Sequence, residues 1–325
     1  MKVLFTRKLP DQLVDPLKDQ FNVVMWEKEN DPMPRDLLLK EVEDADAIFT
    51  NVADQIDQEL IQKAPNLKVI STMAVGYDNI DVQEATNKGI PVGHTPGVLT
   101  EATADLTFAL LMATGRRIVE GMDVIRRGAW KSWGPFMLTG QSLHRATIGV
   151  IGMGRIGQAV ARRAKGFDMN ILYHNRSRND VAEKEIGASY VTLEELLRQS
   201  DYVVLLAPST PETYQMMGRD QFAMMKETSI FINTSRGTNV DEQALFEALS
   251  EKKIFAAGLD VFETEPISEA HPFLQLENVT VLPHIGSANV ATRMEMANLA
   301  IENIKKGLSG QRLAHVVNEE IYLKK

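Results

Sequence analysis

Three polar residues in the second half of the chain, Arg236, Glu265 and His284, each follow a short apolar run that predicts a β-strand. A guanidinium such as that of Arg236 can hold a carboxylate through two hydrogen bonds and polarise the carbonyl beside it. The imidazole of His284 can protonate a carbonyl oxygen while hydride reaches the carbon, and a carboxylate at Glu265 would favour the protonated ring. These are the side-chain types that reduction of a 2-keto acid requires.

The predicted strands 230–234, 257–260 and 280–282 would place these residues at one edge of a parallel sheet. Ligands of open parallel sheets bind at the carboxyl ends of the strands. Taken alone, however, the arginine also suits a surface or helix-capping charge, the histidine a hydrogen-bonded strand end, and the glutamate a solvated acidic loop. Sequence order by itself does not bring the three together, so their meeting at one site is a prediction.

A glycine-rich turn, Gly152-Met-Gly154-Arg155-Ile156-Gly157, follows an apolar strand-like run and precedes a helical pattern. The first glycine permits a tight turn, the second lets the backbone approach a diphosphate, and the third lets the helix pack close to the strand. The helix N-terminus would offer unpaired N–H groups to the anion. This context predicts dinucleotide binding, and the main alternative is another ligand of the same kind of fold, such as S-adenosylmethionine.

The next predicted strand ends in His174-Asn175-Arg176-Ser177-Arg178 and lacks the carboxylate that binds the ribose of NAD. A 2′-phosphate would bind well to Arg176, Arg178 and the hydroxyl of Ser177. We therefore expect a preference for NADP(H), with NAD(H) possible and Asn175 part of the same cofactor-binding loop. The alternative is a solvated basic loop that tolerates either cofactor.

The composition restricts the partners and the compartment. A net charge of −9 gives no bulk positive field, so we expect neither a nucleic-acid nor a membrane partner. The chain has no cysteine, and its six histidines show no ligand spacing such as His-x-x-x-His, so we expect no metal site. It contains no apolar run long enough for a membrane span or a signal peptide, and we expect a cytoplasmic protein.

Strand-like and helix-like segments alternate along all 325 residues, a length that suits two domains. The first series has predicted strands at 3–6, 23–26, 47–50, 69–73 and 91–95. One long helix is predicted from Thr100 to Arg127, and a last helix at 291–306. The second series has strands at 147–151, 170–173 and 202–206, followed by the three named above. Such alternation predicts parallel sheets with crossover helices.

Five motifs together carry a family resemblance. They are Ser71-Thr-Met-Ala-Val-Gly-Tyr-Asp-Asn-Ile-Asp81, the glycine turn, Asn233-Thr-Ser-Arg-Gly237, Gly258-Leu-Asp-Val-Phe-Glu-Thr-Glu-Pro266 and Pro283-His-Ile-Gly-Ser-Ala288. In them the chain resembles, over essentially its whole length, the D-isomer-specific 2-hydroxyacid dehydrogenases, and most closely the glyoxylate/hydroxypyruvate reductase and 2-ketogluconate reductase branch. The resemblance implies an α/β protein of two Rossmann-like parallel-sheet domains with a cleft between them. A flavodoxin-like substrate domain would comprise residues 1–99 and 290–325, and a dinucleotide-binding domain residues 100–289.

The resemblance also implies roles for single residues. The catalytic residues of the family fall on Arg236, Glu265 and His284. Substrate-binding positions fall on Val75, Gly76, Arg236, His284 and Ser287, where the first two belong to a carboxylate-binding backbone loop. Further cofactor-binding positions fall on Thr103, Ala207, Pro208, Thr213, Thr234, Ser235, Asp260 and Gly286.

The family implies a homodimer, and Trp133 resembles a tryptophan that glyoxylate reductases insert into the partner's active site. A packing aromatic at the dimer interface is an equal alternative for this residue. Three functions stay open, of which NADPH-dependent reduction of glyoxylate, hydroxypyruvate or 2-keto-D-gluconate is favoured. An NAD-linked dehydrogenase of phosphoglycerate or D-lactate is disfavoured by the basic loop at 176–178. A non-catalytic, cofactor-sensing binding protein would have no need of the arginine, glutamate and histidine.

Overall fold

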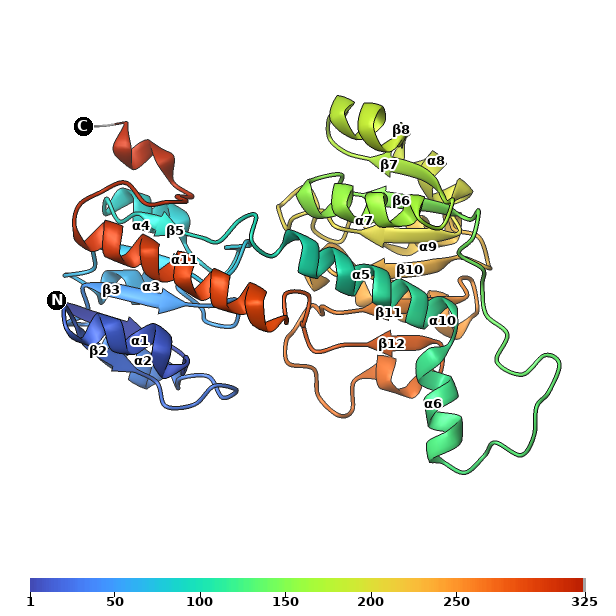
Figure 1. The fold of residues 1–325 in the computed structure, drawn as a ribbon, viewed down its shortest axis with the longest axis horizontal. Helices are drawn as coiled ribbons and strands as arrows, with labels where there is room; N and C mark the ends of the chain where they lie inside the picture. Colours follow the sequence, from blue (N-terminus) through green and yellow to red (C-terminus); the bar gives the residue numbers. More distant parts are fainter. Residues whose placement is uncertain (324–325) are drawn as a thin grey trace. The chain divides into compact units, whose positions relative to one another are not determined.

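Two parallel sheets organise the chain, and each belongs to its own unit (Figure 1). The structure, a computed structural model, describes residues 1–323. Unit 1 combines residues 1–99 with the chain from Asn289 onward, and unit 2 spans Thr100–Ala288. Every pair of neighbouring strands in both sheets is parallel, so the predicted α/β fold with two parallel sheets is confirmed. No helix among residues 1–323 is long and apolar enough to cross a membrane.

The sheet of unit 1 has the strand order β2-β1-β3-β4-β5, which is the flavodoxin-like order. Its strands are β1 (Lys2–Phe5), β2 (Asn22–Met25), β3 (Ala47–Thr50), β4 (Val69–Thr72) and β5 (Val92–Gly93). Its helices are α1 (Asp11–Lys18), α2 (Arg35–Glu41), α3 (Gln58–Gln62), α4 (Val82–Asn87) and α11 (Val290–Leu308). Every residue of β3 and β4 is buried. Strands covered on both faces are mostly apolar, which is why the sequence pattern locates them.

The last helix, α11, is an integral part of unit 1 and packs on β3, β4 and β5 (Figure 1). Asn289 begins it by accepting hydrogen bonds from the N–H groups of its first turn, so unit 1 resumes one residue earlier than expected. The hydroxyl of Ser71 donates to the carbonyl of Ala300 at 2.9 Å. A Cβ on Gly307 would lie 2.6 Å from the Cβ of Val69. The helix therefore approaches β4 as closely as a glycine permits.

The sheet of unit 2 has the order β12-β11-β10-β9-β6-β7-β8. Its strands are β6 (Thr147–Ile151), β7 (Asn170–His174), β8 (Ser189–Tyr190), β9 (Tyr202–Leu205), β10 (Ile230–Asn233), β11 (Ala256–Leu259) and β12 (Val279–Val281). Its helices are α5 (Thr100–Gly115), α6 (Ile118–Arg126), α7 (Arg155–Lys165), α8 (Leu193–Gln199), α9 (Arg219–Met224) and α10 (Glu242–Ser250). The strand order reverses between β6 and β9, and ligands of such sheets bind at the carboxyl ends beside this reversal.

The prediction of one helix from Thr100 to Arg127 is wrong, because the structure has two. Arg117 lies between α5 and α6 in the left-handed region, with φ 52°. The N–H of Gln141 donates to the carbonyl of Gly115 at 2.8 Å. In a continuous helix this carbonyl would instead accept from the N–H four residues later. The chain segment at 140–141 thus ends α5 by occupying this carbonyl. The following helix, α6, contains no buried residue.

Candidate active site

The three predicted catalytic residues follow neighbouring strands in unit 2. Arg236 comes after β10, Glu265 after β11 and His284 after β12, and these strands are adjacent in the sheet. Nδ1 of His284 lies 2.7 Å from Oε2 of Glu265. The charge of Arg236 also acts on the Glu265 carboxyl group. The structure therefore brings the glutamate and histidine into contact and places the arginine within electrostatic reach of them.

The Glu265 carboxylate is held from two directions. The N–H of Phe262 donates to Oε1 at 2.9 Å, and His284 occupies Oε2. Burial by itself would raise the pKa of Glu265, but the hydrogen bond to His284, the Phe262 N–H and the charge of Arg236 outweigh it, so the pKa is lowered. An ionised Glu265 accepts a proton-bearing Nδ1, which leaves Nε2 of His284 as the ring nitrogen that can serve a substrate.

The backbone around His284 is strained and is supported by Asp260. His284 has φ 53°, a left-handed conformation that is uncommon for a residue with a side chain. The next N–H, that of Ile285, donates to Oδ1 of Asp260 at 2.8 Å. Burial raises the pKa of Asp260, and the Ile285 hydrogen bond offsets this only in part. Asp260 thus holds the turn that carries His284. It also lies close to Gly286, where a Cβ would be 3.3 Å from Oδ2 of Asp260.

The turn that carries Arg236 is built by a buried asparagine. Nδ2 of Asn233 donates to the Arg236 carbonyl at 2.9 Å, and Oδ1 accepts from the backbone and hydroxyl of Ser235 at 3.0 and 2.8 Å. A Cβ on Gly237 would overlap the carbonyl group of Phe262. Gly237 therefore allows the arginine turn to pack directly on the segment that leads to Glu265.

The glycine turn touches the neighbouring strand end at the reversal of strand order. Gly152 has φ 103°, and a Cβ there would lie 2.6 Å from the N of Ala207, just beyond β9. A Cβ on Gly157 would overlap the carbonyl of Gly152. Both glycines are thus required by close backbone contacts. A Cβ on Gly154 would meet nothing within 4 Å, so the surface at this residue is open.

The amide groups of this turn suit a diphosphate. Gly154 precedes α7 without a side-chain cap, and the N–H groups of Arg155 and Ile156 find no acceptor among residues 1–323. Oδ1 of Asn175 accepts from the N–H of Met153 at 2.7 Å, so this predicted cofactor residue holds the turn.

A second asparagine supports the glycine turn. Nδ2 of Asn179 donates to the Met153 carbonyl at 2.9 Å, and this role was not predicted. Its Oδ1 accepts from the N–H of Ala182 at 3.1 Å, which links the turn to the π-helical segment Ala182–Ile186. Asn175 and Asn179 together hold both polar groups of the Met153 backbone.

The three residues predicted to bind a 2′-phosphate differ in their surroundings. Arg178 pairs with both carboxylate oxygens of Glu183, at 3.0 and 2.7 Å. Arg176 and Ser177 are exposed, and among residues 1–323 Arg176 makes no hydrogen bond or ion pair. Of the two guanidinium groups, that of Arg176 is the one available to an added anion.

The other predicted cofactor residues line the carboxyl ends of β9 and β10 and the first turns of α5. They are Thr103, Ala207, Pro208, Thr213, Thr234 and Ser235. Thr107, which was not predicted, donates to the carbonyl of Thr103 and lies 2.7 Å from the Thr234 hydroxyl, and so joins α5 to β10. The Thr213 hydroxyl donates to the Pro208 carbonyl at 2.7 Å.

The predicted carboxylate-binding residues come from different parts of the chain. Val75 and Gly76 follow β4 in unit 1, and neither N–H has an acceptor among residues 1–323. Ser287 is partly buried and lies three residues after His284 in unit 2.

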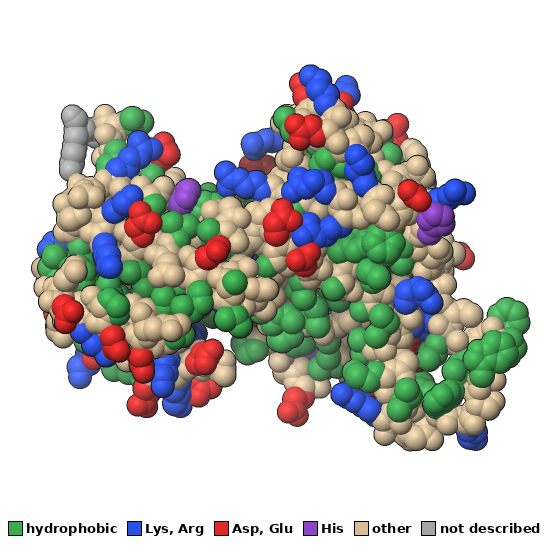
Figure 2. Space-filling view, in the orientation of Figure 1, with side chains coloured by type: hydrophobic (Ala, Val, Ile, Leu, Met, Phe, Trp, Pro, Cys, Tyr) green, Lys and Arg blue, Asp and Glu red, His purple; other side chains and the backbone are tan. Residues whose placement is uncertain are grey.

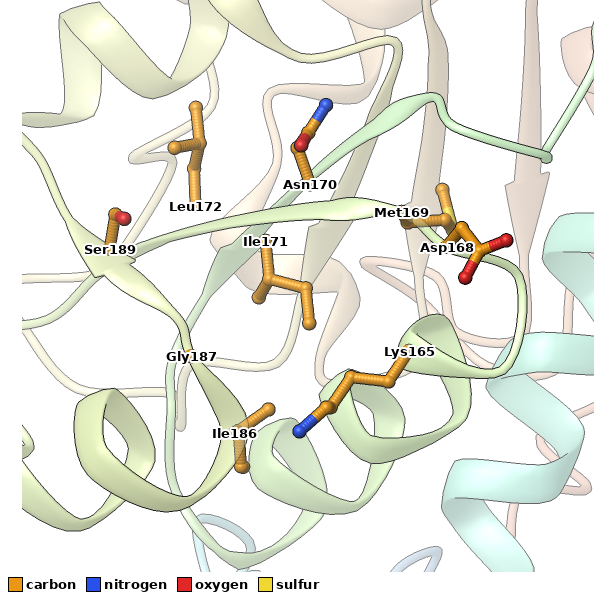
Figure 3. Close-up of a pocket in the computed structure, with 9 residues that line it drawn as sticks. All are labelled: Lys165, Asp168, Met169, Asn170, Ile171, Leu172, Ile186, Gly187 and Ser189. Carbon is orange, nitrogen blue, oxygen red and sulfur yellow. The ribbon is translucent and has the colours of Figure 1, made fainter.

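A hollow at the edge of the unit 2 sheet contains none of the predicted residues (Figure 3). Asn170 and Ile171, which begin β7, lie in its wall together with Lys165 at the end of α7. It is therefore at the amino end of β7, away from the carboxyl ends where the glycine turn and His284 lie.

Comparison with known proteins identifies the family. A model described as the NAD binding domain of D-isomer specific 2-hydroxyacid dehydrogenase matches residues 108–286. The chain is also 48% identical to a glyoxylate reductase of Korarchaeum cryptofilum over 321 residues, which cover 98% of this chain and 96% of that protein. The chain belongs to the D-isomer specific 2-hydroxyacid dehydrogenase family. The predicted family, and the prediction of an NAD(P)-dependent dehydrogenase, are thus confirmed.

Two further members of this family support its glyoxylate reductase branch. A glyoxylate reductase of Pyrococcus furiosus is 48% identical over 324 residues, which cover 98% of this chain and 96% of that protein. The structure of an NADPH-dependent glyoxylate/hydroxypyruvate reductase from Sinorhizobium meliloti, in complex with NADP and malonate, superposes with a TM-score of 0.85 at 33% identity. That comparison covers 98% of this chain and 97% of the other.

Proposed function

We propose that this dehydrogenase uses NADPH to reduce a small 2-keto acid to the D-2-hydroxy acid. Glyoxylate, hydroxypyruvate and 2-keto-D-gluconate are the candidate substrates. The observation that carries the proposal is the 2.7 Å contact between His284 and Glu265 beside Arg236, in the same unit as an open glycine turn. The names of the glyoxylate reductases that the chain resembles agree with this choice of substrate class.

Each catalytic side chain has a separate task in the proposed reaction. A dinucleotide held at the glycine turn would supply the hydride. Arg236 binds the substrate carboxylate and polarises the C2 carbonyl. Nε2 of His284 gives its proton to the carbonyl oxygen, while the Glu265 carboxylate fixes the ring through Nδ1. The N–H groups of Val75 and Gly76 and the hydroxyl of Ser287 are predicted to complete carboxylate binding.

A keto-acid panel assayed with NADPH and with NADH tests this function. We expect NADPH to be consumed with at least one of the three candidate acids. Faster turnover of D-lactate or phosphoglycerate with NAD would favour the NAD-linked alternative. No oxidation or reduction of either cofactor with any acid would favour a cofactor-sensing binding protein.

The preference for NADPH is predicted to depend mainly on Arg176. This guanidinium is exposed and makes no hydrogen bond within residues 1–323, although its charge acts on Glu212. Its replacement should therefore remove charge-assisted hydrogen bonds to a 2′-phosphate. We expect Arg176→Ala to weaken NADPH binding by roughly tenfold to a hundredfold and NADH binding very little, as measured by fluorescence titration. Arg178→Ala should have a smaller effect because Glu183 already pairs with that side chain. Equal or tighter binding of NADH by the wild-type protein would contradict the preference.

We also propose that two copies of the chain form a homodimer through α6 and the loop after it. These elements expose large apolar side chains (Figure 2). They are Ile118, Val119, Met122, Ile125, Trp130, Trp133, Phe136 and Met137. Phe136 and Trp133 are 84% and 77% exposed. A cluster of exposed apolar side chains of this size usually marks a protein–protein interface. Trp133 has two predicted roles in this dimer, insertion into the partner's active site or packing within the interface. The cytoplasmic location also stays a prediction.

Ile125→Asp is predicted to separate the dimer. Ile125 is 64% exposed on α6, and a carboxylate there would be buried against apolar surface. Light scattering coupled to size exclusion should give the mass of a monomer for this variant and of a dimer for wild type. Val181→Asp is the control, because Val181 is 52% exposed but lies outside this patch. A dimer that survives Ile125→Asp, or a monomeric wild type, would rule out this interface.

A further inference from the structure

The backbone loop at Gly76 is held by the end of the neighbouring strand. β5 lies beside β4 in unit 1, and Thr95, just beyond β5, donates its N–H to the carbonyl of Ala74 at 2.8 Å. Nδ1 of the His94 ring lies 3.0 Å from the next carbonyl, that of Val75. A carbonyl oxygen can only accept, so Nδ1 of His94 carries the hydrogen. Two successive carbonyls of the loop therefore have fixed directions.

Fixing these carbonyls also fixes two N–H groups. In a trans peptide the N–H points away from the C=O of the same plane, and both peptides are trans. The carbonyl of Ala74 shares its plane with the N–H of Val75, and the carbonyl of Val75 shares its plane with the N–H of Gly76. Both N–H groups lack acceptors among residues 1–323. Successive N–H groups held in this way form a site for an anion.

The backbone of His94 is held by residues that are distant in the sequence. The carbonyl of His94 accepts from Nδ2 of Asn303 at 3.2 Å, and Oδ1 of Asn303 accepts from the N–H of His315. Asn303 is completely buried on α11. The Tyr77 ring meets the His94 ring edge-on, with centroids 5.7 Å apart. The hydrogen bond from His94 to Val75 is therefore built into unit 1.

We propose that His94 is a positioning residue for substrate binding, because its Nδ1–H sets the direction in which the Gly76 N–H points. This inference rests on the proposed function in taking the substrate carboxylate as the anion at the loop. The hydrogen bond acts on substrate and transition state alike, so its loss should raise KM for the keto acid and leave kcat nearly unchanged. Dinucleotide affinity should stay the same, because the glycine turn belongs to unit 2.

A matched pair of variants separates the hydrogen bond from the shape of the side chain. His94→Asn keeps an N–H donor at the position of Nδ1, whereas His94→Leu has nearly the same shape as asparagine and no donor. We expect His94→Leu to raise KM for glyoxylate by about fivefold to tenfold. His94→Asn should stay near the wild-type KM, and both variants should bind NADPH as wild type does. If His94→Leu does not fold, His94→Phe keeps the ring without the donor and is used in its place.

Calorimetric binding of oxamate to the NADPH-loaded protein provides a readout that does not need turnover. The same order of affinities is expected: wild type and His94→Asn similar, His94→Leu weaker by the same factor as its KM. If the three proteins bind oxamate with this order of affinities but wild type reduces no keto acid, the role of His94 stands and the proposed function fails. If the Leu and Asn variants have equal KM and equal oxamate affinity, or if NADPH binding falls in parallel, the role of His94 is wrong.

Discussion

Replacing His284 with alanine is expected to lower kcat for the keto acid by about 10²–10⁴, because the variant has no group to protonate the carbonyl oxygen. Binding of NADPH should change little, since the glycine turn and Arg176 do not depend on this ring. Steady-state kinetics and a cofactor titration on the same preparation measure both effects. Only a loss confined to turnover identifies His284 as the proton donor.

His144→Ala is the control for this experiment. His144 is exposed and lies before β6, at the end of the sheet opposite the glycine turn. This variant should keep the kcat of wild type. Turnover that survives in His284→Ala, or a comparable loss in His144→Ala, would end the assignment of His284.

Gly237→Ala is expected to cause the second large effect. The new methyl group would overlap the Phe262 carbonyl group and the N of Glu263, and these are backbone atoms that cannot rotate away. The arginine turn and the segment that leads to Glu265 would have to separate. We expect the free energy of unfolding to fall by about 1–3 kcal/mol, as is typical of overpacking. We also expect kcat/KM to fall roughly a hundredfold, because Arg236 and Glu265 would both move.

Gly218→Ala provides a matched control for this substitution. Gly218 precedes α9 in the same unit, and a Cβ there would meet its nearest neighbour at an ordinary 3.5 Å. Thermal unfolding and keto-acid kinetics should therefore stay close to wild type for Gly218→Ala. If Gly237→Ala behaves like this control, the close packing of the two loops is not needed for the site.

The parts of the site that could be predicted from sequence are those set by strand ends. Arg236, Glu265 and His284 each follow an apolar run, and adjacent parallel strands bring such positions to one edge of a sheet. The predicted role of the glycine turn agrees with the contacts of Gly152 and the open surface at Gly154. A tight turn and a close backbone approach each require a glycine, so both can be recognised in the sequence.

The parts that could not be predicted depend on contacts between segments distant in the sequence. Arg178 looked free because its partner Glu183 lies on a π-helical turn that no sequence pattern indicated. The break between α5 and α6 depends on the carbonyl of Gly115, which is taken by a chain segment that returns 26 residues later, at Gln141. Local periodicity contains no information about such competition for a backbone group.

Asp260 shows the same limit within the site. It stood in a motif that carries the family resemblance, but the N–H group from which it accepts, that of Ile285, belongs to another turn 25 residues further along the chain. A side chain that holds a distant turn leaves no pattern in the spacing of polar residues. The supporting role of Asp260 was therefore visible only in the structure.

Transfer of label from the cofactor tests most directly whether hydride reaches C2 of a keto acid bound beside Arg236 and His284. NADPH carrying deuterium at the transferable position should be incubated with hydroxypyruvate and the wild-type protein, and the product analysed by mass spectrometry and chiral chromatography. We expect D-glycerate with one deuterium at C2. Unlabelled glycerate, the L-isomer, or no deuterated 2-hydroxy acid from hydroxypyruvate or from any other keto acid of the panel would contradict it.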